Sequence, residues 1–231
     1  MSKRPALPAD FLDHAGLNRQ HVFDLQALPA EIADRIETRA GECQLILFGH
    51  GGRRLWECVQ ASDIGGENPI DDYSMRTVAQ WFAEHLPSRH FRFIFPGDQP
   101  IGLQALGELA GWHRPSPIMV GVDRQWGSWY AYRAVVVADT NFQPSRVLID
   151  RSPCMECPGQ PCIAACPAGA LHAGHFDLET CSRFRLKPAS PCSHGCMARL
   201  ACPVGSEHRY DDAQIRHSYT RSLTVIRQYY C

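Results

Sequence analysis

Eight cysteines lie close together in the last third of this 231-residue chain. The first four follow the spacing C-x2-C-x4-C-x3-C-P, and the second four are more widely spaced but also end in Cys-Pro. Thiolates are the ligands that soft metals prefer, and a cubane iron–sulfur cluster takes four of them. The segment therefore has enough thiols for two [4Fe-4S] clusters. The eight residues are Cys154, Cys157, Cys162, Cys166, Cys181, Cys192, Cys196 and Cys202.

The first motif is similar to the bacterial ferredoxin pattern C-x2-C-x2-C-x3-C-P. It keeps the first and last gaps and the Cys-Pro, but its middle gap is widened to four residues. Zinc and disulfides are the alternatives. Zinc sites typically use two close cysteine pairs, and only Cys154 and Cys157 form such a pair, while disulfides need an oxidising compartment. The spacing favours iron–sulfur clusters, and Cys43, Cys58 and Cys231 are expected to be bystanders.

The composition divides the chain near residue 150. All five tryptophans precede that point and the cysteine cluster follows it, so we expect one domain over 1–150 and a small second one over 151–231. With 23 basic and 24 acidic residues, the net charge of −1 gives no electrostatic case for binding nucleic acid or an anionic membrane. No apolar run approaches the roughly 18 residues of a membrane span. The start has no apolar signal region, so a cytoplasmic location is expected.

Hydrophobic periodicity predicts the elements that must position these thiols. Strands and helices alternate before residue 150, which indicates an α+β or α/β fold around a central sheet. A helix is also expected over 211–231, with Asp211 or Asp212 as its cap and one apolar face for docking. The Gly-rich stretch 49–52 is interpreted as a tight turn. Strands are expected at 43–52, 90–97, 116–122 and 127–139, and helices at 27–40, 71–86 (capped by Asp71 or Asp72) and 101–112.

The segment LGELAGWHRPSPIMVGVDRQWGSWYAYRAVVVAD, followed by the eight cysteines, resembles epoxyqueuosine reductase. Its stretch SPIMVGVDRQWGSWYAYRAVVV is also similar to the cobalamin-processing trafficking proteins, whose fold is related to flavin nitroreductases. The resemblance implies a nitroreductase-like sheet domain before a two-cluster ferredoxin-like domain, with cobalamin as a cofactor. It implies a catalytic role for Asp98, and pocket walls at Trp112, Trp126, Trp129 and Tyr130.

The chain departs from that family in three places. The family continues into C-terminal helical repeats that help hold tRNA, whereas this chain ends at Cys231. The family's catalytic Asp lies in a D-x-x-P-like context, whereas the counterpart here, Asp98-Gln99-Pro100, is one residue shorter, and the Gly-Lys that follows Gly-Trp in the family is His113-Arg114 here. These departures argue against queuosine chemistry on tRNA. Separately, the sequence has no D-x-H-x-x-G corrinoid motif, so any cobalamin would bind without a His ligand from that motif.

Together, these features predict an iron–sulfur redox protein whose two clusters pass electrons to a cofactor, such as cobalamin, or to a substrate in the first domain. A corrinoid-dependent or related reductase is one candidate. The alternatives are a non-enzymatic ferredoxin-type electron carrier and a zinc-stabilised binding protein. A redox partner protein is expected in either redox case. By analogy with two-cluster ferredoxins, in which the fourth cysteine serves the neighbouring cluster, the ligand sets would be Cys154, Cys157, Cys162 and Cys202 for cluster one, and Cys166, Cys181, Cys192 and Cys196 for cluster two.

Overall fold

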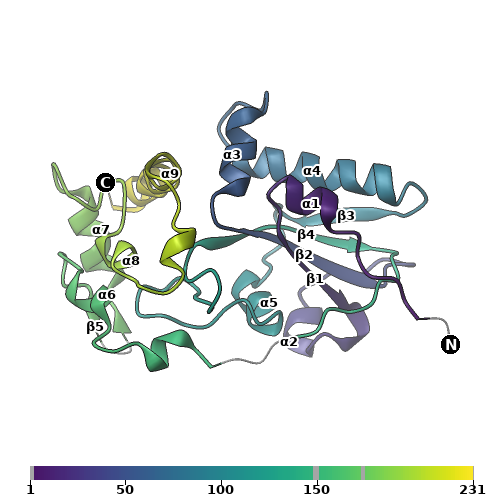
Figure 1. Ribbon diagram of the computed structural model, residues 1–231, viewed down its shortest axis with the longest axis horizontal. Helices are drawn as coiled ribbons and strands as arrows, with labels where there is room; N and C mark the ends of the chain where they lie inside the picture. Colours follow the sequence, from purple (N-terminus) through teal and green to yellow (C-terminus); the bar gives the residue numbers. More distant parts are fainter. Residues whose placement is uncertain (1–2, 148–150, 173–174, 231) are drawn as a thin grey trace. The chain divides into compact units, whose positions relative to one another are not determined.

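The computed structural model describes residues 3–147, 151–172 and 175–230 (Figure 1). It contains two compact units. The sheet unit comprises residues 1–111 and 130–149, and the cysteine-rich unit comprises residues 112–129 and 150–231. Trp112–Trp129 belongs to the cysteine-rich unit, although it comes before the last strand of the sheet in the sequence. Among the described residues, no helix is long and apolar enough to cross a membrane.

A four-stranded antiparallel sheet forms the centre of the sheet unit, in the order β1-β2-β4-β3. The chain is therefore of mixed α+β class. The strands predicted at 43–52, 90–97 and 127–139 are confirmed as β2, β3 and β4, whereas β1 was not predicted. Because β2 continues through Gly51, the interpretation of 49–52 as a tight turn is wrong. The strands are β1 (Arg19–Asp24), β2 (Gln44–Gly51), β3 (Phe91–Phe95) and β4 (Tyr130–Ala138).

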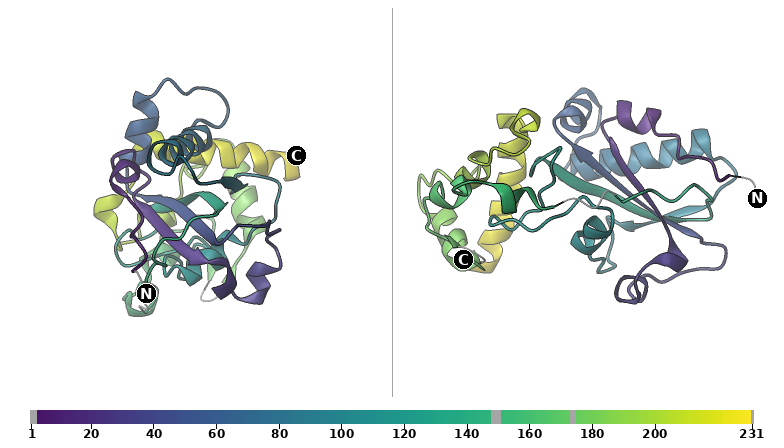
Figure 2. Two further views of the ribbon diagram at one scale, coloured as in Figure 1. Left: turned by 90° about the vertical axis from the view of Figure 1, so that its right-hand side faces the viewer. Right: turned by 60° about the horizontal axis from the view of Figure 1, so that its bottom comes forward.

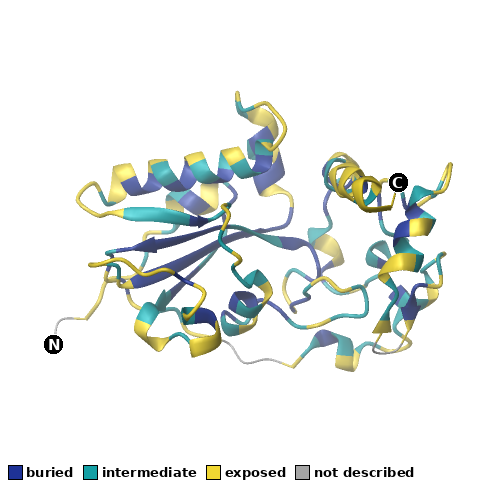
Figure 3. Cartoon of the chain, turned by 180° about the vertical axis from the view of Figure 1, so that it is seen from behind, coloured by how far each residue is buried: buried dark blue, intermediate teal, exposed yellow. Residues whose placement is uncertain are grey.

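Helices cover both faces of this sheet. Figure 1 and Figure 2 show α1, α3 and α4 on one side and α2 and α5 on the other. Strand β2 is consequently buried at every residue, which explains why its sequence is a continuous apolar run rather than an alternating one (Figure 3). The helices are α1 (Asp10–His14), a 3-10 turn η1 (Leu25–Ala27), α2 (Ala30–Ala33), α3 (Arg54–Ala61), α4 (Pro69–His85) and α5 (Leu103–Leu109).

The core of the sheet unit is built around Trp81 of α4. Its ring lies edge-on to Phe48 and Phe82, with centroids 6.0 and 4.9 Å away, and its Nε1–H donates to the Pro8 carbonyl at 2.8 Å. The buried indole is thus packed and hydrogen-bonded at once. The helix predicted at 71–86 is confirmed, but it begins at Pro69, so Asp71 lies in the first turn and is not the cap.

Three other secondary-structure predictions are wrong. The helix expected at 27–40 is reduced to η1 and α2, although Ile32 and Ile36 are buried as its pattern required. The strand expected at 116–122 is a loop with one bridge, Arg114 to Val122, because the two prolines at 115 and 117 have no N–H to donate. Helix α3 follows directly on Gly52, whose φ is +74°, where no helix was expected.

The cysteine-rich unit consists of short elements and one long helix. The helix expected at 211–231 is confirmed as α9, and the Asp211 carboxylate caps it by accepting from the Gln214 N–H at 2.7 Å. The elements are η2 (Pro153–Glu156), α6 (Pro161–Ala164), β5 (Leu171–His172), β6 (His175–Phe176), α7 (Leu178–Leu186), α8 (Met197–Leu200), η3 (Ser206–His208) and α9 (Asp212–Tyr230).

Two glycines explain why the turn around Trp126 belongs to this unit. Gly127 and Gly205 both have positive φ, at +56° and +61°. A Cβ on Gly127 would lie 1.9 Å from the Val204 carbonyl oxygen, so only glycine lets the turn approach the loop that follows Cys202. The backbone of residues 126–127 therefore packs directly on the segment carrying the last cysteine.

Candidate metal centre

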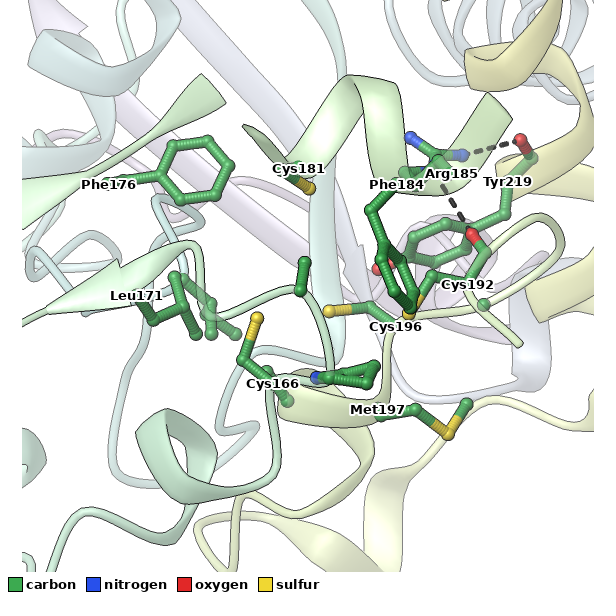
Figure 4. Close-up of a pocket in the computed structure, with 15 residues that line it drawn as sticks. Cys166, Leu171, Phe176, Cys181, Phe184, Arg185, Cys192, Cys196, Met197 and Tyr219 are labelled. Atoms are coloured by element: carbon green, nitrogen blue, oxygen red, sulfur yellow. Dashed lines mark hydrogen bonds between the residues drawn. The ribbon is translucent and has the colours of Figure 1, made fainter. Parts of the chain in front are cut away.

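Four thiols line one cavity of about 160 Å³ in the cysteine-rich unit. The cavity holds several times the roughly 30 Å³ that one water occupies in the liquid. Figure 4 shows the sulfur atoms of Cys166, Cys181 and Cys196 turned into the same space, and apolar side chains, including Leu171, complete the wall. We call these four the cavity cysteines: Cys166, Cys181, Cys192 and Cys196.

The cavity cysteines come from four separate places in the chain. Cys166 follows α6, Cys181 lies within α7, Cys192 is in the connection between α7 and α8, and Cys196 is the residue before α8. The Cys196 sulfur accepts from the Arg199 N–H at 3.4 Å, so it caps α8.

The remaining four cysteines of the two motifs form a second group. We call these the loop cysteines: Cys154, Cys157, Cys162 and Cys202. Burial is the largest influence on the pKa of Cys154 and raises it, and the neighbouring thiols Cys202, Cys162 and Cys157 raise it further. The pKa of Cys162 is also raised by burial and then by Cys202 and Cys157. Thiols that affect one another's charge in this way are close neighbours. The fourth thiol of this group comes from the second motif, just as Cys166 of the first motif lies among the cavity cysteines.

The cavity cysteines also influence one another. Burial raises the pKa of Cys181 to about 11, with Cys196, Cys166 and Cys192 adding to the effect and Arg185 opposing it. Burial likewise raises the pKa of Cys192. Burial of these two thiols thus disfavours their charged form in the absence of a cation.

Four thiols around a cavity of this size form a donor set that an iron–sulfur cluster could use. A tetrahedral zinc ion with Zn–S bonds of about 2.3 Å would draw its sulfurs to roughly 3.8 Å from one another. Within the part of the chain that the structure describes, no three such side chains are gathered closely enough for one ion. The cavity leaves room between the sulfurs for a larger group, so the donor set fits an iron–sulfur cluster.

The described cysteines form no disulfides. Cys43 and Cys58 lie in the sheet unit, outside both groups, as expected of bystanders. Cys231 lies outside the described residues. His194 and His208 have other partners: His194 Nδ1 is 2.9 Å from the Thr220 hydroxyl, and the His208 ring contacts that of Trp126 at an interplanar angle of 47°.

Two of the predicted cofactor walls are occupied by protein contacts. Trp129 is only 1% exposed and packs with Tyr210 and Ile215, with the Arg199 guanidinium carbon 4.4 Å from its ring centroid. The Trp126 ring lies 4.3 Å from that of His208. Neither residue lines the cavity of the cavity cysteines.

The other predicted site residues are divided between the units. Trp112 is buried at the start of the cysteine-rich unit's first segment, and Tyr130 is buried in the sheet unit, where Arg19 covers its ring at 4.6 Å. Asp98 is exposed on the connection between β3 and α5. Their roles in cofactor binding and catalysis stay predictions.

Sequence reasoning missed Arg185 and the ring of Tyr219, both of which line the cavity. Arg185 lies four residues after Cys181 on α7, and residues at this spacing share one face of a helix. That signal was present in the sequence. Tyr219 was expected only to dock α9, and burial raises its pKa to about 12.

No protein-family model matches the sequence, and no curated protein matches it. Solved structures do match. The chain shares its mixed α+β fold with two kinds of reductase, the epoxyqueuosine reductases and the reductive dehalogenases, over most of its length. The predicted resemblance to epoxyqueuosine reductase is thereby confirmed at the level of the fold.

The epoxyqueuosine reductases of Streptococcus thermophilus and Bacillus subtilis superpose with TM-scores of 0.52 and 0.53, covering 84% and 88% of this chain at 11% identity. A reductive dehalogenase, from a study of B12-dependent dehalogenation, gives a TM-score of 0.51 over 98% of this chain at 15% identity. The chain spans 64% and 66% of the two epoxyqueuosine reductases and 37% of the dehalogenase.

Proposed function

We propose that this chain is an iron–sulfur redox protein that binds two [4Fe-4S] clusters and passes electrons to an acceptor. The observation that carries the proposal is the grouping of the eight cysteines into two sets of four. Each set takes one thiol from the other motif, which is the exchange that two-cluster ferredoxins make. The cavity cysteines would hold cluster two, and the loop cysteines Cys154, Cys157, Cys162 and Cys202 would hold cluster one.

Two cysteine-proline pairs support this exchange. Cys166 precedes Pro167 and Cys202 precedes Pro203, and the locked φ of proline turns the chain after each of these thiols. Such a turn would direct each thiol away from its own motif and toward the other cluster. The nitroreductase-like and ferredoxin-like domain descriptions belong to the same proposal.

The protein's own contribution would be to exclude water and to hold the thiolates. Leu171, Phe176 and Phe184 line the cavity and would keep solvent from its contents. The Arg199 N–H on Cys196 would stabilise the negative sulfur. When bound, the clusters supply one-electron transfer at low potential.

Cobalamin is the acceptor that the fold likeness favours. The expected roles of Trp112, Trp126, Trp129 and Tyr130 as pocket walls, and of Asp98 in catalysis, belong to the same proposal. The electrons would come from a redox partner protein. A ferredoxin-type carrier without a catalytic cofactor is the second candidate, and the packing of Trp129 among Tyr210 and Ile215 favours it, because that ring is then part of a protein core.

Iron and sulfide analysis of anaerobically purified protein tests the cluster proposal. About eight irons and eight sulfides per chain are expected. Four irons after full reconstitution would leave one cluster and contradict the two-set assignment. Zinc without sulfide would favour the zinc-stabilised binding protein.

Titration with cobalamin, followed by absorbance and calorimetry, separates the two redox candidates. A saturable spectral change in the loaded protein is expected if the chain is a corrinoid-dependent reductase. The matched variant is Trp126→Ala, which removes a half-buried predicted wall. If millimolar cobalamin gives no response, the electron-carrier candidate is favoured.

A further inference from the structure

Arg185 places a positive charge inside the cysteine-rich unit. Its side chain lines the cavity beside the cavity cysteines, and the residue is 8% exposed (Figure 4). Nε donates to the Cys192 carbonyl at 3.1 Å, Nη1 to the Ser222 hydroxyl at 3.0 Å, and Nη2 to the Tyr219 carbonyl at 3.0 Å. All three nitrogens are engaged, so the guanidinium is fixed in place.

None of these partners carries a negative charge. The acceptors are two carbonyls and one hydroxyl, and the guanidinium carbon also lies 5.2 Å from the centre of the Tyr219 ring. Within the described residues, no carboxylate forms an ion pair with Arg185. A buried cation costs several kcal/mol unless an opposite charge compensates it. Arg185 lines the same cavity as the four cavity cysteines, and these thiols would become anionic on binding a metal.

The surroundings of the loop cysteines differ. The arginine that lines the surface beside Cys157 is Arg124, and it pairs with Glu156 at 2.8 Å. Both side chains are about half exposed, at 44% and 53%, so solvent screens the pair. An arginine that is paired and exposed to solvent has little effect on the reduction potential of a nearby cluster. A buried, fixed arginine has a strong effect.

We propose that Arg185 is the buried counter-charge of cluster two and makes that cluster the easier of the two to reduce. The inference rests on the proposed function. A cluster with its four thiolates is a dianion when oxidised, and one electron from an external donor makes it a trianion. A fixed cation stabilises the trianion more than the dianion, and this difference raises the reduction potential. Arg185 acts through the field at the cluster, so it is a positioning residue rather than a catalytic one.

A redox titration of the full loaded chain, monitored by electron paramagnetic resonance, tests the inference. Cys181→Ala assigns the signal of cluster two, and cluster one serves as an internal reference. In Arg185→Met, the equilibrium constant for reducing cluster two is expected to fall by about tenfold, which is about 59 mV for a one-electron couple, with cluster one unchanged.

Two matched variants separate charge from structure. Arg183→Gln removes an arginine from the same helix, but from an exposed ion pair with Glu179, and no shift is expected. Ser222→Ala removes one hydrogen bond of Arg185 and keeps its charge, so the potential of cluster two should stay near that of the wild type. A shift in Ser222→Ala as large as that in Arg185→Met would overturn the charge argument.

If the Arg185→Met protein no longer binds cluster two, its potential cannot be measured, and Arg185→Lys is then the variant to test. Lysine keeps the charge without the planar fork. Retention of cluster two at a near-wild-type potential supports the inference, and loss of the cluster in both variants reduces Arg185 to a structural brace and overturns it. Unchanged potentials in Arg185→Met, with both clusters present, also overturn it and leave the proposed function standing. A wild-type chain without clusters removes the proposed function, and the inference with it.

Discussion

The sheet unit and the cysteine-rich unit are stabilised by different means. In the sheet unit, an apolar core that includes Phe48, Trp81 and Phe82 fills the space between β2 and α4. In the cysteine-rich unit, two of the helices that carry or flank cysteines, α6 and α8, are only four residues long. Helices this short do not persist in water without tertiary support. Hydrophobic burial therefore holds the first unit. The second has only small apolar clusters, such as Trp129 with Tyr210 and Ile215, and the proposed iron–sulfur clusters would add to its stability.

Removal of iron should therefore have the largest effect on folding, and this effect should be confined to the cysteine-rich unit. Chelation of the anaerobic protein is expected to make residues 151–210 sensitive to protease while the sheet unit stays folded, because metal-binding energy is folding energy in such a unit. Limited proteolysis with mass spectrometry measures this. Equal protection of residues 151–210 with and without iron would break the comparison.

Single cysteine substitutions should show which thiols share a cluster within the cysteine-rich unit. Cys166→Ala is expected to remove cluster two and leave cluster one, whereas Cys157→Ala should do the reverse, because the two thiols of one motif lie in different sets. Resonance spectra of the reduced variants measure the outcome, with Cys58→Ala as a control outside both sets. Loss of the same cluster in both variants would mean that each motif closes on its own cluster.

The stability of the sheet unit should depend on its apolar core rather than on iron. Trp81→Ala removes the largest fully buried side chain and its hydrogen bond to Pro8, so it is expected to lower the free energy of unfolding by about 3–5 kcal/mol. Gln80→Ala, on the exposed side of α4, should change it by less than about 0.5 kcal/mol. Urea denaturation followed by circular dichroism gives both values. Loss of cluster signals in Trp81→Ala with an unchanged urea midpoint would contradict the division of roles.

Acid should destabilise the sheet unit through His21. Burial lowers the pKa of this histidine to about 4, from about 6.5 in an unfolded chain. The unfolded state binds the extra proton between these values, so stability is complete above about pH 6.5 and falls by about 3 kcal/mol as the pH drops toward 4. In His21→Leu this part of the pH dependence should disappear, while the exposed control His90→Gln should keep it. Identical unfolding curves from pH 7 to 4 in the wild type would refute the prediction.

The smallest expected effect concerns the cap of α9. Asp211→Ala removes the carboxylate that accepts from the Gln214 N–H, and it should destabilise the start of the helix by about 1 kcal/mol. Asp212→Ala, at an exposed position in the first turn, is the matched control. Amide hydrogen exchange in the first turn of α9 measures the difference. Equal exchange in the two variants would assign the stabilisation to the helix dipole alone.

Local patterns in the sequence determined several features correctly. The buried strand at 43–52, the helix at 71–86 and the cap of α9 each depend on residues close together in the chain, where hydrophobic periodicity and chain geometry decide the outcome. The same reasoning failed at 27–40, where an amphipathic pattern buried its isoleucines without forming a long helix.

Only the tertiary structure decided the features that join distant residues. It placed Trp112–Trp129 with the cysteines, because Gly127 meets the loop after Cys202 at a distance that no other residue permits. It also gathered Cys166 with Cys181 around one cavity and placed Arg185 in the wall of that cavity, where the carbonyls of Cys192 and Tyr219 hold its guanidinium. Such placements depend on how separate elements pack. The hydrophobic periodicity of one segment carries no information about which distant segment it will contact. The sequence by itself therefore determined which atoms could bind metal, and packing decided which of them share a site and which charge stands beside it.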